Sequence, residues 1–212
     1  MKQEANVLHT SLTLMGINMH HNEGQNWKKR KPVFGVGIND ANYVTQGLNG
    51  SCPYYLTWRG MLQRCYSPKW HDKYPSYKNV EVCKDWHTFS VFRGWMEEQD
   101  WFGKQLDKDL LGDGKRYSKE TCCFLSKKLN SFLINNSTRS KDDLPRGVYK
   151  NKDRYQALCR NPFGGKSYVG NFGCPTSAHF AYVRAKQSHA KRFYEIESDP
   201  RIKKAILKRF SL

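Results

Sequence analysis

The 212-residue chain carries 36 Lys and Arg against 19 Asp and Glu, which gives a formal net charge of +17 at pH 7. Such an excess attracts polyanions, while aromatic residues at 14% supply enough core-forming side chains to exclude a wholly disordered chain. The sequence has no run of about 18 apolar residues and no signal-peptide core, so we expect an intracellular protein without a membrane partner.

The seven cysteines are an odd number without a CxxC pair, which argues against a disulfide framework and against a compact zinc ribbon. We expect most of them to be reduced and buried. One alternative stays open, a structural zinc site built from Cys65, Cys83 and Cys122 with His71 or His87.

The opening residues 1–32 are predicted to form a basic flexible arm, because they are polar, irregular and end close to the cluster Lys28–Lys31. Apolar residues then recur at i, i+3, i+4 and i+7, which predicts an amphipathic helix over 54–66. A second helix is expected over 87–98, where aromatic residues share one face.

The middle of the chain predicts two short strands around a tight glycine turn, followed by a helix. The strands are expected over 104–111 and 117–125, the turn at 112–114 and the helix over 126–133. The polar segment 135–145 contains Ser, Asn and Asp and ends in Pro, so it is predicted to be an interdomain linker.

The closing third predicts a three-strand meander with a helix packed on it. Extended runs over 147–150, 154–160 and 166–172 are separated by turn residues. Alanines at helical spacing predict a helix over 175–194 whose small side chains let it lie close against the sheet, and a short basic helix is expected over 200–210.

Charge concentrates in this closing part, because residues 146–212 hold 15 Lys and Arg against 4 Asp and Glu. Strand alternation turns Tyr155 and Ala157 toward the helix and Gln156 toward solvent. The solvent face of the sheet is predicted to consist of Arg146, Tyr149, Gln156, Arg160, Lys166 and Tyr168. Such a face can enter the major groove of double-stranded DNA, with Arg on guanine, Gln on adenine and Lys on phosphate.

Four sequence blocks of this part occur in a recognisable order. They are Gly147-Val148-Tyr149, Arg154-Tyr155-Gln156-Ala157, Tyr168-Val169-Gly170-Asn171-Phe172 and Pro175-Thr176-Ser177-Ala178-His179-Phe180-Ala181-Tyr182. Together they resemble the plant ethylene-response-factor (APETALA-type) DNA-binding domain, and the resemblance implies that the sheet reads the major groove. Leu158 stands where the plant domains tend to carry an acidic residue, so the resemblance does not transfer the plant target sequence.

The run Leu106-Asp107-Lys108-Asp109, the glycine turn, the run from Tyr117 to Phe124 and Asn130 resemble the two strands and helix of phage HNH homing endonucleases. The resemblance implies one divalent metal, Mg²⁺ or Mn²⁺, with Asp107 and Asn130 as its ligands. Lys108 stands at the position of the general-base histidine of the wider group, and Thr121 at that of the asparagine that orients it. Lys108 suits phosphate contact, and Asp109 is then the candidate base or second ligand.

These expectations combine into an α+β protein with an HNH-like ββα-metal nuclease domain over 33–134 and an ethylene-response-factor-like DNA-binding domain over 146–212. We expect a DNA endonuclease that hydrolyses phosphodiester bonds near a recognised duplex site, in the host cytoplasm if a phage encodes it. A non-catalytic DNA-binding or regulatory protein with a degenerate nuclease core stays an alternative. An RNA-binding protein is a third, disfavoured because the sequence has no RNA-recognition aromatic motif.

Overall fold

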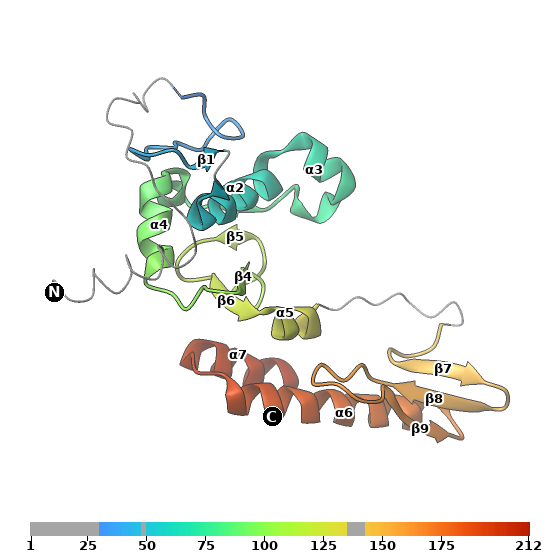
Figure 1. Cartoon of the computed structure of the whole chain (residues 1–212). Coiled ribbons are helices and arrows are strands. Elements are labelled where there is room, and N and C mark those ends of the chain that lie inside the picture. Colours follow the sequence, from blue (N-terminus) through green and yellow to red (C-terminus); the bar gives the residue numbers. More distant parts are fainter. Residues whose placement is uncertain (1–29, 48–49, 135–142) are drawn as a thin grey trace. The chain divides into compact units, whose positions relative to one another are not determined.

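The computed structural model describes residues 30–47, 50–134 and 143–212 (Figure 1). The chain divides into two compact units, Met1–Phe102 with Gly112–Phe124 and Gly103–Leu111 with Leu125–Leu212. Most of the predicted arm and of the predicted linker lies outside the described residues. The predicted domain division therefore stays a prediction.

The first unit is built around two helices that pack through aromatic residues, α2 (Pro53–Tyr66) and α4 (Phe89–Glu97). Both were predicted from the apolar spacing and both are confirmed. Trp58 is fully buried, lies against Phe89 and donates a 2.7 Å hydrogen bond from Nε1 to the carbonyl oxygen of Trp86. The shorter elements of this unit include β1 (Gln46–Gly47), β2 (Gly50–Ser51), α3 (Pro68–Lys73), η2 (Pro75–Tyr77), β3 (Glu81–Val82) and η3 (Lys84–His87).

In the middle of the chain the predicted tight glycine turn does not directly join the two paired strands, because the second predicted run is divided into two strands. These are β5 (Arg116–Tyr117) and β6 (Cys123–Ser126). Strand β5 pairs in parallel with β3, whereas β6 pairs with β4 (Lys104–Asp107).

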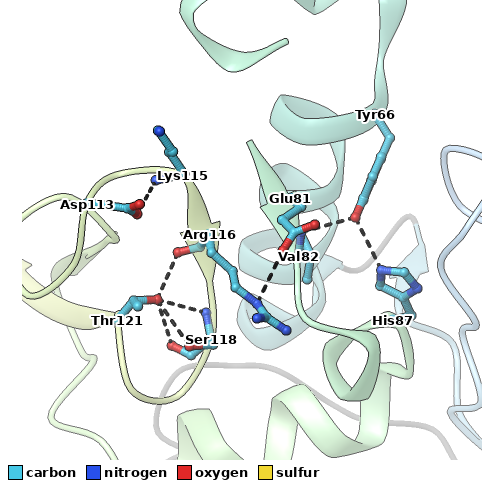
Figure 2. A network of polar contacts seen from close by, with 9 residues as sticks. All are labelled: Tyr66, Glu81, Val82, His87, Asp113, Lys115, Arg116, Ser118 and Thr121. Carbon is cyan, nitrogen blue, oxygen red and sulfur yellow. Dashed lines mark hydrogen bonds and ion pairs between the residues drawn. The ribbon is translucent and has the colours of Figure 1, made fainter. Parts of the chain in front are cut away.

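A turn held by one hydroxyl separates β5 from β6 (Figure 2). The Oγ1 of Thr121 accepts a 3.1 Å hydrogen bond from the backbone N–H of Ser118 and donates a 2.8 Å bond to the carbonyl oxygen of Arg116. The same view shows Arg116 facing Glu81 of β3, with 3.5 Å between Nε and Oε1. After β4, the chain therefore first forms β5, which pairs with β3. It then turns and only afterwards forms β6, which pairs with β4.

The second unit contains α5 (Lys127–Leu133), which begins where the Oγ of Ser126 accepts a 3.2 Å hydrogen bond from the N–H of Leu129. Two cations hold the end of α5 against the closing helices α6 (Pro175–Ile196) and α7 (Pro200–Phe210). Lys186 of α6 donates to the carbonyl oxygen of Phe132 at 2.7 Å, and Arg209 of α7 donates to that of Leu133 at 2.8 Å. The three helices at 127–133, 175–196 and 200–210 match the predicted ones.

The closing sheet has the antiparallel order β7 (Val148–Asn151), β8 (Arg154–Leu158) and β9 (Tyr168–Phe172). The predicted alternation is confirmed. Ala157 is fully buried with Val148 and with Ala178 of α6, and Tyr155 packs against this cluster. The small side chains let α6 lie close to the sheet, as the alanine spacing predicts.

The described residues combine helices with small sheets, so the α+β prediction is confirmed at that level. The seven cysteines lie within the described residues and form no disulfide there; Cys83 is half-buried, Cys174 exposed and the other five buried. Among the described residues, no helix has the length and apolar character needed to cross a membrane.

Candidate nucleic-acid interface and nuclease core

The face of the closing sheet that points away from α6 carries a row of cross-strand partners. Gln156 at the centre of β8 lies opposite Tyr149 of β7 and opposite Asn171 of β9. Next to this row, Leu158 lies opposite Tyr168. Directly opposed residues point to the same side of a sheet, so two tyrosines and two amides share this surface. Both tyrosine side chains project outward, with 51% of Tyr149 and 53% of Tyr168 exposed.

Two of the three predicted cations lie beside this row, and none of the three is on a strand. Arg160 follows the end of β8 and Lys166 precedes β9, and both are exposed. Arg146 lies in the turn before β7, is half-buried and is directed toward α6: its side chain is hydrogen-bonded to Tyr182, and its carbonyl oxygen is 2.9 Å from the Nδ1 of His179. The predicted surface is thus an amide and aromatic centre with cations at its edges.

Two residues of this surface, Asn171 and Arg154, were not predicted from the sequence. Asn171 faces Gln156, and the guanidinium of Arg154 donates a 3.1 Å hydrogen bond to the carbonyl oxygen of Asn171. A β-bulge between Ala157 and Leu158 explains the omission of Asn171, since it shifts the register by one residue. Strict alternation from Tyr168 would have turned Asn171 toward the core.

Asp107, the first predicted metal ligand, ends strand β4 and holds the turn that follows. Its Oδ1 accepts hydrogen bonds from the backbone N–H groups of Asp109 at 3.0 Å and Leu110 at 2.8 Å. Burial raises the pKa of the Asp107 carboxyl, while the two backbone hydrogen bonds act in the opposite direction. The second carboxylate oxygen, Oδ2, takes no part in these turn bonds.

Asn130, the second predicted ligand, projects from α5 onto strand β4. Its Nδ2 donates a 2.9 Å hydrogen bond to the Oε1 of Gln105. Residues two apart on a strand point to the same face, so Asn130 contacts the face of β4 that also carries Asp107. The order of strand, strand and helix thus brings the two predicted ligands to one side of β4.

The residues at the predicted base positions are engaged in structural contacts. Lys108 is buried, with its Nζ 2.6 Å from the Oδ1 of Asp109. An ammonium group paired in this way donates hydrogen bonds and cannot accept a proton. Thr121 uses its hydroxyl within the turn between β5 and β6. Lys108 therefore does not take the chemical role of the histidine of the wider HNH group, and Thr121 does not take that of the asparagine.

No group of three or more His, Cys, Asp or Glu side chains that could hold a metal occurs within residues 30–47, 50–134 and 143–212. The residues of the alternative zinc site make other contacts. The Nε2 of His87 lies 3.2 Å from the hydroxyl of Tyr66 (Figure 2), and the Nε2 of His71 lies 3.0 Å from the carbonyl oxygen of Arg64.

Comparisons with protein-family models, with curated proteins and with solved structures gave no match to this chain. Both resemblances therefore stay interpretations of the sequence.

Proposed function

We propose that this protein binds double-stranded DNA through the exposed face of the sheet β7–β9. The observation that carries the proposal is the exposed Tyr149 directly opposite the amide of Gln156, with Arg160 and Lys166 at the edges of the sheet. Side-chain amides pair with adenine edges, arginine with guanine edges and lysine with phosphates, and a narrow sheet can enter the major groove.

The net charge supports a polyanionic partner, because +11 of the total +17 falls within residues 146–212. Phosphate contacts of this kind are independent of sequence and weaken steeply with salt, whereas base contacts distinguish one sequence from another. We therefore expect binding with both a salt-dependent part and a sequence-dependent part.

The test measures fluorescence anisotropy of labelled duplexes selected from a random pool by the purified protein. Gln156→Ala should weaken binding to the selected sequence by about 1–3 kcal/mol, since one bidentate base contact is lost, and should leave binding to unrelated duplexes unchanged. Gln187→Ala on α6 is the matched control, because the Nε2 of Gln187 donates to the carbonyl oxygen of Phe210 away from the sheet.

Equal losses for Gln156→Ala and Gln187→Ala would contradict the proposed surface. A competition experiment with duplex RNA separates the DNA-binding function from an RNA-binding one. We expect duplex DNA to displace the probe at far lower concentration than duplex RNA, because the deep, narrow major groove of RNA does not admit a sheet.

A second candidate function is metal-dependent hydrolysis of a phosphodiester bond, favoured by Asp107 at the end of β4 and by Asn130 of α5, which donates a hydrogen bond to Gln105 of the same strand. The Oδ2 of Asp107 and the Oδ1 of Asn130 fit a hard cation, because the turn bonds use the other carboxylate oxygen and the Gln105 contact uses the amide nitrogen. Bound Mg²⁺ or Mn²⁺ would supply positive charge for the leaving oxygen. Asp109, with 57% of its side chain exposed, is the remaining candidate base.

Cleavage of the selected duplex with and without Mg²⁺ or Mn²⁺ tests this second function. Asp107→Asn and Asn130→Ala should abolish cutting while DNA binding persists. Asp113→Asn is the control, because Asp113 also accepts a turn hydrogen bond, from the N–H of Lys115 at 2.9 Å (Figure 2). Absence of metal-dependent cutting by the unmodified protein would leave a non-catalytic DNA-binding protein with a degenerate nuclease core.

A further inference from the structure

A cavity of about 480 Å³ lies within the second unit, between α5, the turn before β7, the end of β8 and α6. This volume falls within the range of sites that hold small ligands, about 300–1,000 Å³. Five of its lining residues are basic, namely Lys127, Lys128, Arg146, Arg160 and Lys186. None of the described residues that line it is Asp or Glu.

Lys186 shows how the surrounding charges act inside this cavity. Its Nζ lies 2.7 Å from the carbonyl oxygen of Phe132 and 3.7 Å from the centroid of the Phe132 ring. Burial lowers the pKa of Lys186 to about 8; the charges of Arg146 and Arg209 act in the same direction and Cys159 acts against them. The five basic residues that line the cavity, with no acidic side chain among its described lining, form an arrangement that an anion would stabilise.

The basic cavity adjoins the sheet surface. Arg146, Tyr149 and Arg160 line it and also belong to the predicted DNA-binding face. Lys127 and Lys128 are exposed and come from α5, which contributes nothing to that face. A duplex on the sheet therefore reaches a second group of cations at the edge formed by β7 and the end of β8.

We propose that this basic cavity binds phosphodiester groups of the DNA strand that flanks the sheet surface, with Lys127 and Lys128 of α5 as contacts in addition to those of the sheet. The proposal rests on the proposed DNA-binding function and extends the interface from the sheet to α5. The contacts are to phosphate and carry no sequence preference of their own.

The experiment compares Lys127→Gln/Lys128→Gln with Lys204→Gln/Lys208→Gln, which removes two exposed charges from α7 of the same unit. Binding of selected and unrelated duplexes is measured by anisotropy over a range of salt concentrations. Each lost phosphate contact should reduce the magnitude of the slope of log K against log salt by about 0.9. The slope of the α5 variant should therefore be smaller in magnitude by about 1.8, and that of the α7 control should change far less. At about 0.15 M salt this corresponds to roughly 30-fold weaker binding, equal for both kinds of duplex.

The outcomes distinguish failure of the cavity proposal from failure of the proposed DNA-binding function. If the unmodified protein binds DNA and both double variants keep its salt slope, the cavity proposal is overturned and DNA binding by the sheet stands. If the unmodified protein binds no DNA, both fail together. Calorimetric titration with inorganic phosphate and with a mononucleotide distinguishes the source of the phosphate. Tight binding of either, lost in Lys127→Gln/Lys128→Gln but kept in the α7 control, would make the cavity a site for a free phosphate compound and would overturn the DNA-backbone assignment.

Discussion

Gly147 lies at the entry to β7, between Arg146 and the buried Val148, and its backbone has φ of +77°. A Cβ at this position would lie 2.1 Å from Cδ2 and 2.4 Å from Cγ of Tyr182 on α6. Gly147→Ala therefore combines a left-handed backbone, which costs about 1–2 kcal/mol, with overpacking, which costs about 1–3 kcal/mol. We expect the free energy of unfolding of the second unit to fall by about 2–5 kcal/mol.

A double-mutant cycle with Tyr182→Ala separates the two contributions, because the alanine removes the ring atoms that the new Cβ would meet. In that background Gly147→Ala should cost only the backbone part, about 1–2 kcal/mol, and the coupling energy should equal the overpacking part. An equal cost of Gly147→Ala in both backgrounds would refute the steric reasoning.

Urea unfolding followed by two probes makes this measurement specific to the second unit. All six tryptophans precede Gly103, so tryptophan fluorescence reports the first unit, whereas far-UV circular dichroism reports the helices of both units, including the 22-residue α6 and the 11-residue α7 of the second. We expect Gly147→Ala to shift the dichroism transition more than the fluorescence transition. A shift confined to fluorescence would mean that Gly147 does not act through its own unit.

Three further results are expected. Trp58→Phe should lower the free energy of unfolding, measured by urea unfolding, by about 1–3 kcal/mol, because it leaves the carbonyl oxygen of Trp86 without its hydrogen-bond donor. Cys174 should be alkylated first, since it is exposed and a hydrogen bond from Ser177 lowers its thiol pKa; mass spectrometry after iodoacetamide treatment identifies the site. Between about pH 7 and about pH 9, DNA affinity measured by anisotropy should fall more for the unmodified protein than for Lys186→Arg, because lysine loses its charge as the pH rises through its pKa of about 8 and arginine keeps it.

Each of these has a control within the chain. Trp70 is the control for Trp58, because its Nε1 is buried with no hydrogen-bond partner in the structure, so Trp70→Phe should cost much less. An equal cost would show that the Trp86 bond contributes nothing. Modification of the half-buried Cys83 before Cys174 would contradict the reactivity argument, since burial raises the pKa of Cys83. Parallel pH profiles for the unmodified protein and Lys186→Arg would exclude Lys186 from the interface.

The elements that the sequence predicted well are those whose side-chain spacing repeats. Helices α2 and α6 carry apolar or small residues at helical spacing over several turns, and a helix buries such a stripe. The pairing of Tyr149 with Gln156 could likewise be expected, because alternation along two adjacent strands fixes which side chains share a face.

The elements that were missed depend on contacts between distant residues or on very short segments. Strands β3 and β5 have two residues each, too few for any period to appear. The role of Thr121 depends on a hydroxyl that bonds within its own turn. The hydrogen bonds of Lys186 and Arg209 to α5 join residues 54 and 76 positions apart, and nothing in the sequence spacing marks such partners.

The attachment of α5 to the closing helices bears on how a nuclease core and a DNA-binding surface would act together in this chain. The ring of Phe132 lies 5.1 Å from that of Phe193 on α6 and 5.3 Å from that of Phe210 on α7, between centroids. The same helix carries Asn130, which contacts β4, and lines the basic cavity with Lys127. The packing of α5 and the hydrogen bonds to its last two carbonyl oxygens hold it against α6 and α7, and β4, α5 and the closing sheet belong to the same compact unit. Under the two proposed functions, hydrolysis at Asp107 and Asn130 would therefore occur at a distance from the DNA-binding sheet that is set by the packing of α5.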